Sequence, residues 1–403
     1  MTALGDVATF VRGINFKPDD VVPVGTPGSV ACMRTKNVQS ELDLSDVWGV
    51  SEAFVKRDDQ YLQVGDILVS SANSWNLVGR GCWVPELPWR SSFGGFVSVL
   101  RADPHRVDRR FLFYWFTSSR IQALVRSFGQ QTTNISNLNV ERCLKLSLTL
   151  PPLSEQRRIA GVLDLSKDLR ATRRDALAEL DVLTQAIFLD MFTGGLDGPA
   201  IDVAKHRTGL PKGWSWELLT DVARLATGHT PDRENEDYWN GSIPWISLTD
   251  IRELDGTVAK KTIQNITQLG IDNSSSVLLP KGTVCFSRTA SIGFVTVMGS
   301  EMATSQDFVN WTCGPRLDPT YLMWSFLCAR RRLRELSSGS THKTIYMRVV
   351  EQFYGLIPPI ALQREFARRV AAIDDLKVVE RLGVAELDSL FSSLQHSTLN
   401  GAM

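Results

Sequence analysis

The feature that most constrains this chain is an internal repeat that extends over most of its 403 residues. The segment PPLSEQRRIAGVLDLSKDL, beginning at Pro151, matches PPIALQREFARRVAAIDDL, beginning at Pro358, and the offset of 207 residues continues without a gap. Identical residues in this register are Gln156 and Gln363, Arg157 and Arg364, Asp168 and Asp375, Leu169 and Leu376, and Arg174 and Arg381. A repeat of this length predicts two copies of one structural unit in the same chain.

The starts of the two halves repeat as well. LGDVATFVRG, from Leu4, aligns with LTDVARLATG, from Leu219. Between the start and the end of each half, the similar segments are short and their offset drifts from 217 to 210 residues. The two halves are therefore expected to share a scaffold and to differ in detail.

The end of each repeat has the pattern of a long helix. Apolar residues recur at heptad-like spacing, and Pro151-Pro152 and Pro358-Pro359 mark the two helix starts. Each helix is predicted to have about 40 residues and hence a length of about 60 Å. Because a long helix with one narrow apolar stripe needs a partner helix, we expect the two to pair as an antiparallel coiled coil.

The apolar stripe lapses in both helices near Arg173 and Glu380, which are 207 residues apart. Equivalent residues meet near a pseudo-twofold axis. We therefore expect an ion pair between these two side chains at the centre of the helix pair, a polar contact that fixes the register. The alternative is that both charges face water, as charges on long helices commonly do.

The segments before the helices have a different pattern, with short apolar runs bounded by Gly, Pro, Asn and Ser. Strands are predicted at 67–69, 93–99, 276–279 and 294–297, and helices at 109–127 and 319–336. This mixture predicts an α+β fold rather than a doubly wound nucleotide-binding sheet. The expected division of the chain is a first domain at 1–150, a helix at 151–195, a linker at 196–212, a second domain at 213–357 and a helix at 358–403.

Composition excludes several classes of protein. The 44 basic and 44 acidic residues balance, and 43% of the residues are hydrophobic, as in an ordinary globular protein. The first residues lack a secretion signal and no apolar run is long enough to cross a bilayer, so we expect a cytoplasmic protein without membrane contact. The six cysteines show neither metal-ligand spacing nor a disulfide framework.

The motifs of the common catalytic classes are missing from the sequence. There is no GxxxxGK[ST] loop, no HExxH, and neither Pro-Pro pair follows the Asn or Asp of an adenine methyltransferase site. We therefore expect no catalytic residues, no bound metal and no cofactor on this chain. A carboxylate cluster of a nuclease remains open, because acidic residues are plentiful.

Several segments resemble the specificity subunits of type I restriction-modification systems. These are GLPKGW from Gly209, WELLTDVARLATG from Trp216, GSIPWISLTDI from Gly241, ATSQDF from Ala303 and LPPLSEQRRIAGVLD from Leu150. The resemblance covers nearly the whole chain in the family's order, with a target-recognition domain and a helix occurring twice. One departure is Ala361-Leu362 in the second copy where the first has Ser154-Glu155.

The resemblance implies a function. Each target-recognition domain would read one half of a bipartite sequence in double-stranded DNA, and the helices would set the spacer and dock two methyltransferase subunits. S-adenosylmethionine, ATP and Mg would be bound by the partner subunits, which include the motor-nuclease subunits. For contact with a partner we single out the Gln-Arg pairs that begin the helices: Gln156, Arg157, Gln363 and Arg364.

Polar loops at matching repeat positions are the candidates for DNA contact. Lys and Arg bind phosphates, whereas Arg, Asn, Gln, Ser and Thr read the edges of bases. In the first half the candidates are Arg34, Lys36, Asn37, Ser70, Asn73, Gln130, Gln131, Thr132 and Asn134. In the second half they are Ser247, Thr249, Arg288, Thr289, Thr341, His342 and Lys343.

Three functions remain open at this point. The chain is a DNA reader in a type I restriction-modification complex, the reading subunit of a related phage-defence methylation system, or a coiled-coil scaffold that does not bind DNA. Unlike loops on a repeated frame favour DNA reading, because a symmetric scaffold has little need of two different faces.

Overall fold

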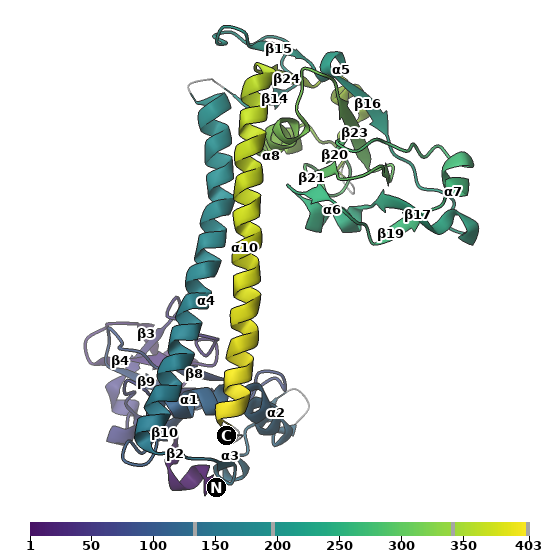
Figure 1. The fold of residues 1–403 in the computed structure, drawn as a ribbon. Coiled ribbons are helices and arrows are strands. Elements are labelled where there is room, and N and C mark those ends of the chain that lie inside the picture. Colours follow the sequence, from purple (N-terminus) through teal and green to yellow (C-terminus); the bar gives the residue numbers. More distant parts are fainter. Residues whose placement is uncertain (132–134, 195–197, 340–342, 400–403) are drawn as a thin grey trace. The chain divides into compact units, whose positions relative to one another are not determined.

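The computed structural model describes residues 1–131, 135–194, 198–339 and 343–399 (Figure 1). Its contacts divide the chain into two units, and each unit contains one globular domain and parts of two long helices. The first unit is Met1–Arg174 with Leu382–Met403, and the second is Asp175–Arg381. The unit boundaries thus fall within the long helices, because each end of a helix packs in a different core.

Within its described residues, the first unit has four small antiparallel or mixed sheets. Their strand orders are β2-β10-β6-β8, β3-β5-β4-β9, β11-β12-β7 and β1-β13. The strands are β1 (Thr2–Ala3), β2 (Ala8–Arg12), β3 (Val21–Pro23), β4 (Ser29–Met33), β5 (Trp48–Ser51), β6 (Ile67–Ser70), β7 (Ala72–Asn73), β8 (Gly81–Trp83), β9 (Ser91–Phe93), β10 (Val97–Ala102), β11 (Gln130–Gln131), β12 (Ser136–Asn137) and β13 (Ser147–Leu148).

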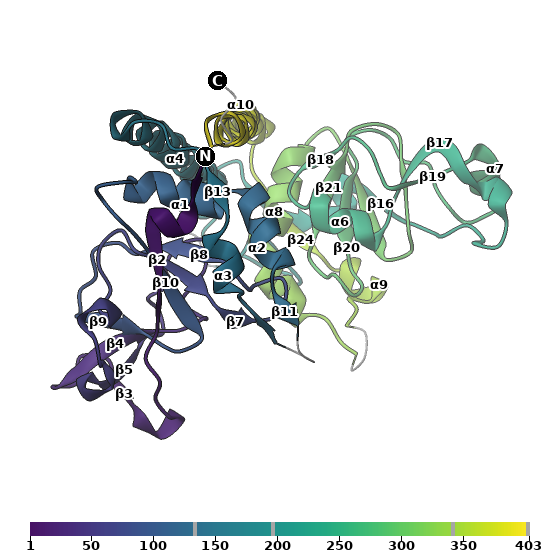
Figure 2. The ribbon, with the colours of Figure 1, turned by 90° about the horizontal axis from the view of Figure 1, so that it is seen from below.

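The first unit contains short helices and segments of the two long helices, and the helix at 109–117 contacts β8 and β10 of the β2-β10-β6-β8 sheet. The helices and segments are α1 (Arg109–Thr117), α2 (Ser119–Ser127), α3 (Val140–Leu144), the first part of α4 (Leu153–Phe188) and the last part of α10 (Ile360–Leu399). Short 3-10 turns occupy Leu4–Asp6, Pro18–Asp20, Glu52–Phe54 and Asp58–Gln60. Figure 2 shows α1 between the strands of this sheet and α4. Their common core contains Phe111 and Trp115 from α1 and Leu163 from α4, all buried.

The second unit is built around a five-stranded sheet of order β16-β23-β20-β21-β18, with smaller sheets β14-β24-β15 and β19-β17-β22. Its strands are β14 (Ile201–Asp202), β15 (Ser215–Leu218), β16 (Ala223–Thr227), β17 (Trp239–Ile246), β18 (Val258–Ala259), β19 (Gln264–Ile266), β20 (Val284–Ser287), β21 (Val295–Met298), β22 (Ala303–Thr304), β23 (Phe308–Cys313) and β24 (Tyr354–Ile357). Its helices are α5 (Leu219–Val222), α6 (Leu248–Leu254), α7 (Gln268–Asp272), α8 (Pro319–Glu335) and α9 (Met347–Val350), with a 3-10 turn at Glu236–Tyr238 and a π-helical turn at Leu189–Thr193 that continues α4.

Within each unit, a segment of α4 contacts a segment of α10. In the first unit, Arg170 and Arg174 of α4 lie 2.5 and 3.5 Å from the carboxylate of Asp388 on α10. In the second unit, Asp181 of α4 lies 2.8 Å from the ammonium of Lys377 on α10. Farther along α4, the ring of Phe188 packs against Phe366, with centroids 5.4 Å apart. In the second unit, later positions on α4 therefore contact earlier positions on α10.

Several predicted elements differ from the structure. The helix predicted at 109–127 is broken at Ser118, whose extended backbone (ψ 145°) separates α1 from α2. The strand predicted at 93–99 is broken by a turn in which the N–H of Val97 donates to the carbonyl of Gly94 at 2.9 Å. The segment 276–279 forms no strand and contributes only an isolated bridge from Leu279 to Met302. The N–H of Ser276 donates to the hydroxyl of Ser274 at 3.1 Å, whereas Leu279 exchanges backbone hydrogen bonds with Met302.

The predicted linker at 196–212 also differs, since part of it is integrated into the second unit. Strand β14 pairs antiparallel with β24, and Ile201 is fully buried in the core of this unit. Among the described helices, none is both long and apolar enough to cross a membrane.

Candidate nucleic-acid interface and docking grooves

The repeated Pro-Pro-x-x-x-Gln motif forms the same buried clamp in both units. In the first unit, the side-chain oxygen of Gln156 accepts a hydrogen bond from the N–H of Asp108 at 2.8 Å, and its amide nitrogen donates to the carbonyl of Pro151 at 2.8 Å. The carboxylate of Asp108 caps α1 by accepting from two backbone N–H groups. The clamp thus joins the start of the long helix to the start of α1.

The second unit repeats this arrangement with one bond more. Gln363 accepts from the N–H of Asp318 at 2.9 Å and donates to the carbonyls of Pro358 at 2.7 Å and Arg316 at 3.0 Å. Asp318 caps α8 as Asp108 caps α1. The long helix and the domain before it are therefore fixed to each other within each unit.

This burial corrects one assignment made from the sequence. Gln156 and Gln363 are 1% and 0% exposed, and their amides are used within the chain. A partner cannot reach them without breaking these bonds, so their role is structural. Arg157 and Arg364, the next residues, are exposed, and contact of these two with a partner remains a prediction.

In the first unit, the candidate loop after β4 is organised around Asp46. The guanidinium of Arg34 lies 3.5 Å from the ring centroid of Trp48 and 3.1 Å from the carboxylate of Asp46, and the Lys36 ammonium lies 2.7 Å from the same carboxylate. Hydrogen bonds from Lys36 and Arg34 lower the pKa of Asp46. Asn37 is fully buried and bonds to the backbone of this loop, so it shapes the loop and does not face solvent.

The other candidate loops of the first unit are those of Ser70 and Asn73 and of Gln130 to Asn134, and the structure describes the second of these only in part. Ser70 is buried, and its hydroxyl accepts from the amide of the half-buried Asn73 at 3.1 Å. The backbone of Gln130 and Gln131 forms β11, which pairs with β12 next to β7, the strand that carries Asn73. The structure thus brings these two loops together. Thr132 and Asn134 lie outside the described residues.

In the second unit, Ser247 caps α6 by accepting from the N–H groups of Thr249 and Asp250, and the Thr249 side chain is exposed. Arg288 donates to the carbonyl of Gln306 at 3.0 Å. An isolated bridge joins Thr289 to Thr344, so the loops at 287–289 and 343–344 are adjacent. Lys343 is exposed, whereas Thr341 and His342 lie outside the described residues.

The structure adds residues that the sequence did not indicate. A cavity of about 460 Å³ beside the Arg34 loop is lined by Arg12, Asn15 and Phe96 as well as by Arg34 and Trp48. Phe96 is 67% exposed. The sequence pattern predicted a strand at 93–99 that includes Phe96, and the turn that exposes this side chain was missed. The Gly94-Gly95 pair was the sequence signal that could have indicated this turn.

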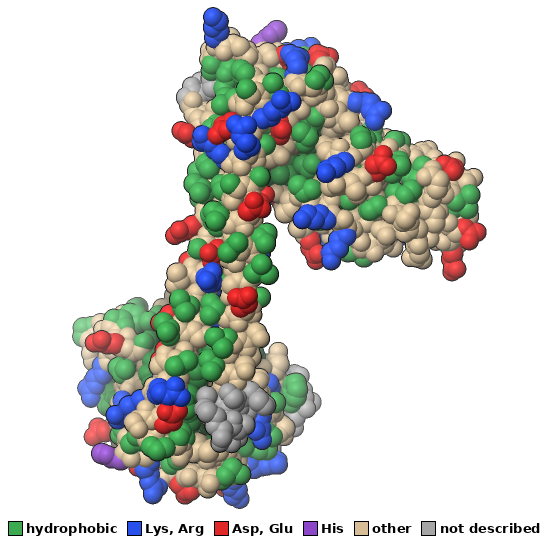
Figure 3. Space-filling view, viewed as in Figure 1, with side chains coloured by type: hydrophobic (Ala, Val, Ile, Leu, Met, Phe, Trp, Pro, Cys, Tyr) green, Lys and Arg blue, Asp and Glu red, His purple; other side chains and the backbone are tan. Residues whose placement is uncertain are grey.

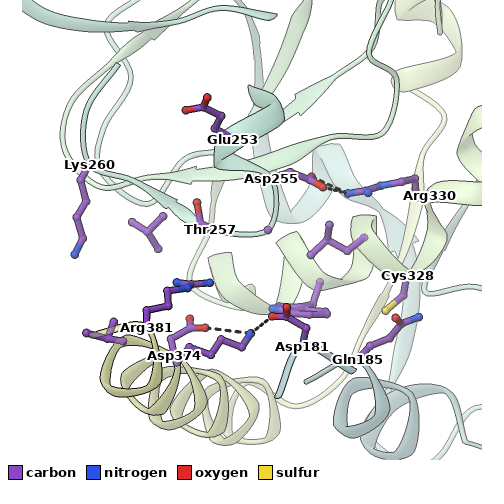
Figure 4. Close-up of a pocket in the computed structure, with 16 residues that line it drawn as sticks. Asp181, Gln185, Glu253, Asp255, Thr257, Lys260, Cys328, Arg330, Asp374 and Arg381 are labelled. Carbon is purple, nitrogen blue, oxygen red and sulfur yellow. Dashed lines mark hydrogen bonds and ion pairs between the residues drawn. The ribbon is translucent and has the colours of Figure 1, made fainter. Parts of the chain in front are cut away.

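A groove at the long helices occurs in each unit. The first unit's groove has a volume of about 1090 Å³ and is lined on α4 by Lys167, Arg170, Ala171 and Arg174. The second unit's groove has a volume of about 730 Å³ and is lined on α10 by Asp374, Lys377, Val378 and Arg381 (Figure 4). Each of these four positions is 207 residues beyond its counterpart. The repeat therefore places equivalent helix positions at a groove in each unit.

The two grooves differ in charge. Five basic and two acidic side chains line the first groove, whereas four of each sign line the second. In the second groove, the nearly buried Lys377 lies between Asp181 and Asp374, at 2.8 and 3.7 Å. Burial raises the pKa of Asp374 in spite of Lys377 and Arg381 nearby. On the opposite wall, Nη2 of Arg330 donates to both carboxylate oxygens of Asp255 at 2.7 Å.

Apolar side chains are exposed on the long helices, as Figure 3 shows in green. Leu165 and Val182 on α4 and Val379 on α10 are 62%, 70% and 58% exposed. Arg173 lies in the first unit and Glu380 in the second, and their ion pair stays a prediction. Within the described residues, no group of three His, Cys, Asp or Glu side chains is placed to hold a metal ion.

The family model for the type I restriction modification DNA specificity domain matches this chain twice, over residues 3–179 and 211–381. Because these matches cover most of the 403 residues, the chain belongs to this family. The resemblance to type I specificity subunits that the sequence motifs indicated is confirmed.

Individual relatives agree with this family. The chain is 21% identical to the type I restriction enzyme StySPI specificity subunit of Salmonella potsdam, over 98% of this chain and 87% of the relative. It is 20% identical to the putative MjaX specificity subunit of Methanocaldococcus jannaschii, over 90% and 84%. The alignment with the MjaIX specificity subunit of the same organism is 26% identical but spans only 47% of this chain and 44% of that relative.

Solved structures share the fold. One is a chain from a study of complex assembly and conformational transition of the type I restriction-modification system, with a TM-score of 0.62 and 16% identity, covering 98% of this chain and 96% of that one. Another is the type I restriction-modification S subunit from M. genitalium, with a TM-score of 0.57 and 12% identity, covering 98% and 94%. Each of these solved chains shares the fold of this chain over nearly its full length.

Proposed function

We propose that each globular domain reads one half of a bipartite DNA sequence, and that the chain is the non-catalytic DNA-reading subunit of a type I restriction-modification complex. The observation that carries this proposal is that the two units share a repeated scaffold but differ in their polar loops. The Gln156 and Gln363 clamps repeat closely. The loops at 34–37 and 247–249, in contrast, differ in charge and in local structure. Two readers of different half-sites need this combination of a common frame and different contact groups.

The residues proposed for contact are those that the structure leaves accessible. Arg34 and Lys36 in the first unit and Thr249, Arg288 and Lys343 in the second are exposed or half-buried on loops. Asn37 and Ser70 are instead proposed to position these loops, because they are buried and bonded within them.

We propose further that α4 and α10 form an antiparallel coiled coil that sets the spacer between the half-sites. The opposite residue order within the second unit supports this arrangement, since Asp181 meets Lys377 while Phe188 meets Phe366. The spacer would then follow from helix length, at about 1.5 Å for each residue.

The two repeat-related grooves are proposed to dock two copies of a methyltransferase subunit. Grooves at repeat-equivalent positions of the two long helices suit two copies of the same partner. The exposed Arg157 and Arg364 lie at the starts of the same two helices and are proposed to add contacts. S-adenosylmethionine, ATP and Mg would be bound by these partners and by the motor-nuclease subunits.

Selection from random DNA tests the reading function. The chain, purified with its methyltransferase partner, is expected to enrich two short sequences at a fixed separation. Replacing Arg288 with Ala should relax one half only, because Arg288 belongs to the second unit. Enrichment of an unsplit sequence would contradict the two-reader proposal, and no enrichment would favour the scaffold.

Native mass spectrometry tests docking. Reversing the charges of Lys167 and Arg174 in the first groove should reduce the bound methyltransferase copies from two to one. The matched change in the second groove is Arg381 to Glu. Two copies bound to both variants would show that the grooves are not the docking surfaces.

A further inference from the structure

The turn between β9 and β10 holds one aromatic side chain outside the core. Phe96 is 67% exposed, yet its backbone is fixed, because its carbonyl accepts hydrogen bonds from the N–H groups of Ser71 at 2.9 Å and Ala72 at 3.2 Å. The N–H of Gly94 also donates to the carbonyl of Met33 at 2.9 Å. A large apolar ring is therefore presented to solvent from a rigid position.

The turn packs closely against the segment after β2. A Cβ atom on Gly95 would lie 2.4 Å from the side-chain oxygen of Asn15, and one on Gly13 would lie 2.3 Å from the carbonyl oxygen of Gly94. Because the close atoms at Gly13 belong to backbone, only glycine fits there, whereas the Asn15 side chain opposite Gly95 can move. The close packing keeps Phe96 at the edge of the cavity of about 460 Å³ that it lines together with Arg12 and Asn15.

The stacked pair of Arg34 and Trp48 also lines this cavity. The guanidinium of Arg34 lies 3.5 Å from the centroid of the Trp48 ring, and Phe16 packs edge-on against Trp48 with centroids 6.4 Å apart. The Nε–H of Arg34 is buried and has no acceptor among the described residues. A buried donor without a partner costs free energy.

These groups define the chemistry of a ligand. Three aromatic rings offer flat apolar contact, whereas Arg12, Asn15 and Arg34 offer hydrogen-bonding groups at the same cavity. Lys36 and Arg34 share the carboxylate of Asp46, which weakens their attraction for a phosphate. A flat group with apolar faces and polar edges matches this lining better than a phosphate does, and a nucleobase is such a group.

We propose that this cavity takes one nucleobase, unstacked from the half-site that the first unit reads. The inference rests on the proposed function and adds Phe96 as a residue that contacts DNA. Phe96 would either stack on the unstacked base or occupy the position that this base leaves in the duplex. Arg34 would donate a hydrogen bond to the edge of the base. Unstacking one base in this way lets a reader test a base edge that the duplex hides.

Fluorescence of 2-aminopurine, together with permanganate oxidation of thymines, tests the proposal on the half-site read by the first unit. Each position is probed in turn with the complex of the full chain and its methyltransferase partner. Phe96→Ala is compared with Trp75→Ala, since Trp75 is also exposed, at 55%, but does not line the cavity. Thermal unfolding confirms that both variants are folded.

One position of the half-site is expected to become unstacked with the original chain and with Trp75→Ala, and to remain stacked with Phe96→Ala. Affinity should fall roughly ten-fold for Phe96→Ala, the loss of one base–aromatic stack. Unstacking that persists in Phe96→Ala would assign it to the partner and overturn the inference. Specific binding without any unstacking would overturn it too, with the proposed function intact, whereas absence of specific binding would overturn both.

Discussion

Replacement of Gln363 by Ala should destabilise the second unit strongly. The change removes three hydrogen bonds and leaves the N–H of Asp318 and the carbonyls of Pro358 and Arg316 without their partner. The site is fully buried, and a buried polar group without a partner costs about 1–3 kcal/mol. Water that enters the space left by the side chain would bond to some of these groups, so we expect the free energy of unfolding to fall by about 3–5 kcal/mol, a large part of the total stability of a domain.

Urea unfolding followed by tryptophan fluorescence measures this loss. Gln156→Ala removes two bonds in the first unit, so its loss should be smaller, about 2–4 kcal/mol. The exposed neighbour Arg364 is the matched control, and Arg364→Ala should change stability by less than about 0.5 kcal/mol. If Gln363→Ala unfolds like the original chain but no longer binds its partner, the glutamine is a docking residue after all, and the reasoning from burial is wrong.

Three further predictions concern charge and burial. A hydrogen bond from Arg316 lowers the pKa of Glu217 below 4.5, so this pair should stabilise the fold above about pH 4.5 and lose its effect as pH falls through the lowered value. The free energies of unfolding of Glu217→Gln and of the original chain should therefore converge in acid. A constant difference between them at all pH values would argue against the pair. Burial raises the pKa of the Cys32 and Cys82 thiols to about 12, so both should resist maleimide at pH 8 until the chain is unfolded. Peptide mapping assigns the label, because Cys313 and Cys328 are only partly buried, and rapid labelling of Cys32 or Cys82 in the native chain would contradict their burial. Charge reversal at Arg173 or Glu380 alone should weaken assembly, and reversal at both should restore it; lack of coupling in this double-mutant cycle would show that both charges face water.

The sequence predicted the parts of this fold that follow from periodicity. The heptad-like pattern placed the two long helices, found at Leu153–Phe188 and Ile360–Leu399, and the repeat placed the clamp residues at their starts. It did not reveal what the glutamines do, because a polar residue beside two prolines resembles an exposed helix start. Only the structure shows that Gln156 and Gln363 turn inward to the caps of the preceding helices.

Tertiary contacts decided the features that sequence reasoning missed. Ser118 interrupts an apolar helical pattern because its backbone adopts an extended conformation between two helices. Phe96 lies in a run of strand-forming residues, and the turn that presents it is held by a hydrogen bond from the N–H of Gly94 to the carbonyl of Met33, 61 positions earlier in the chain. Contacts between residues so distant in sequence leave no periodic signal.

The most direct test of the two-reader account is to map methylated positions in a host genome that expresses the chain with the proposed methyltransferase partner. Residues 1–150 are then replaced by those of a related chain. The account predicts a split methylation motif in which only one half changes and the unread gap keeps its length. A motif that changes in both halves, or that has no gap, would contradict the assignment of one half-site to each unit.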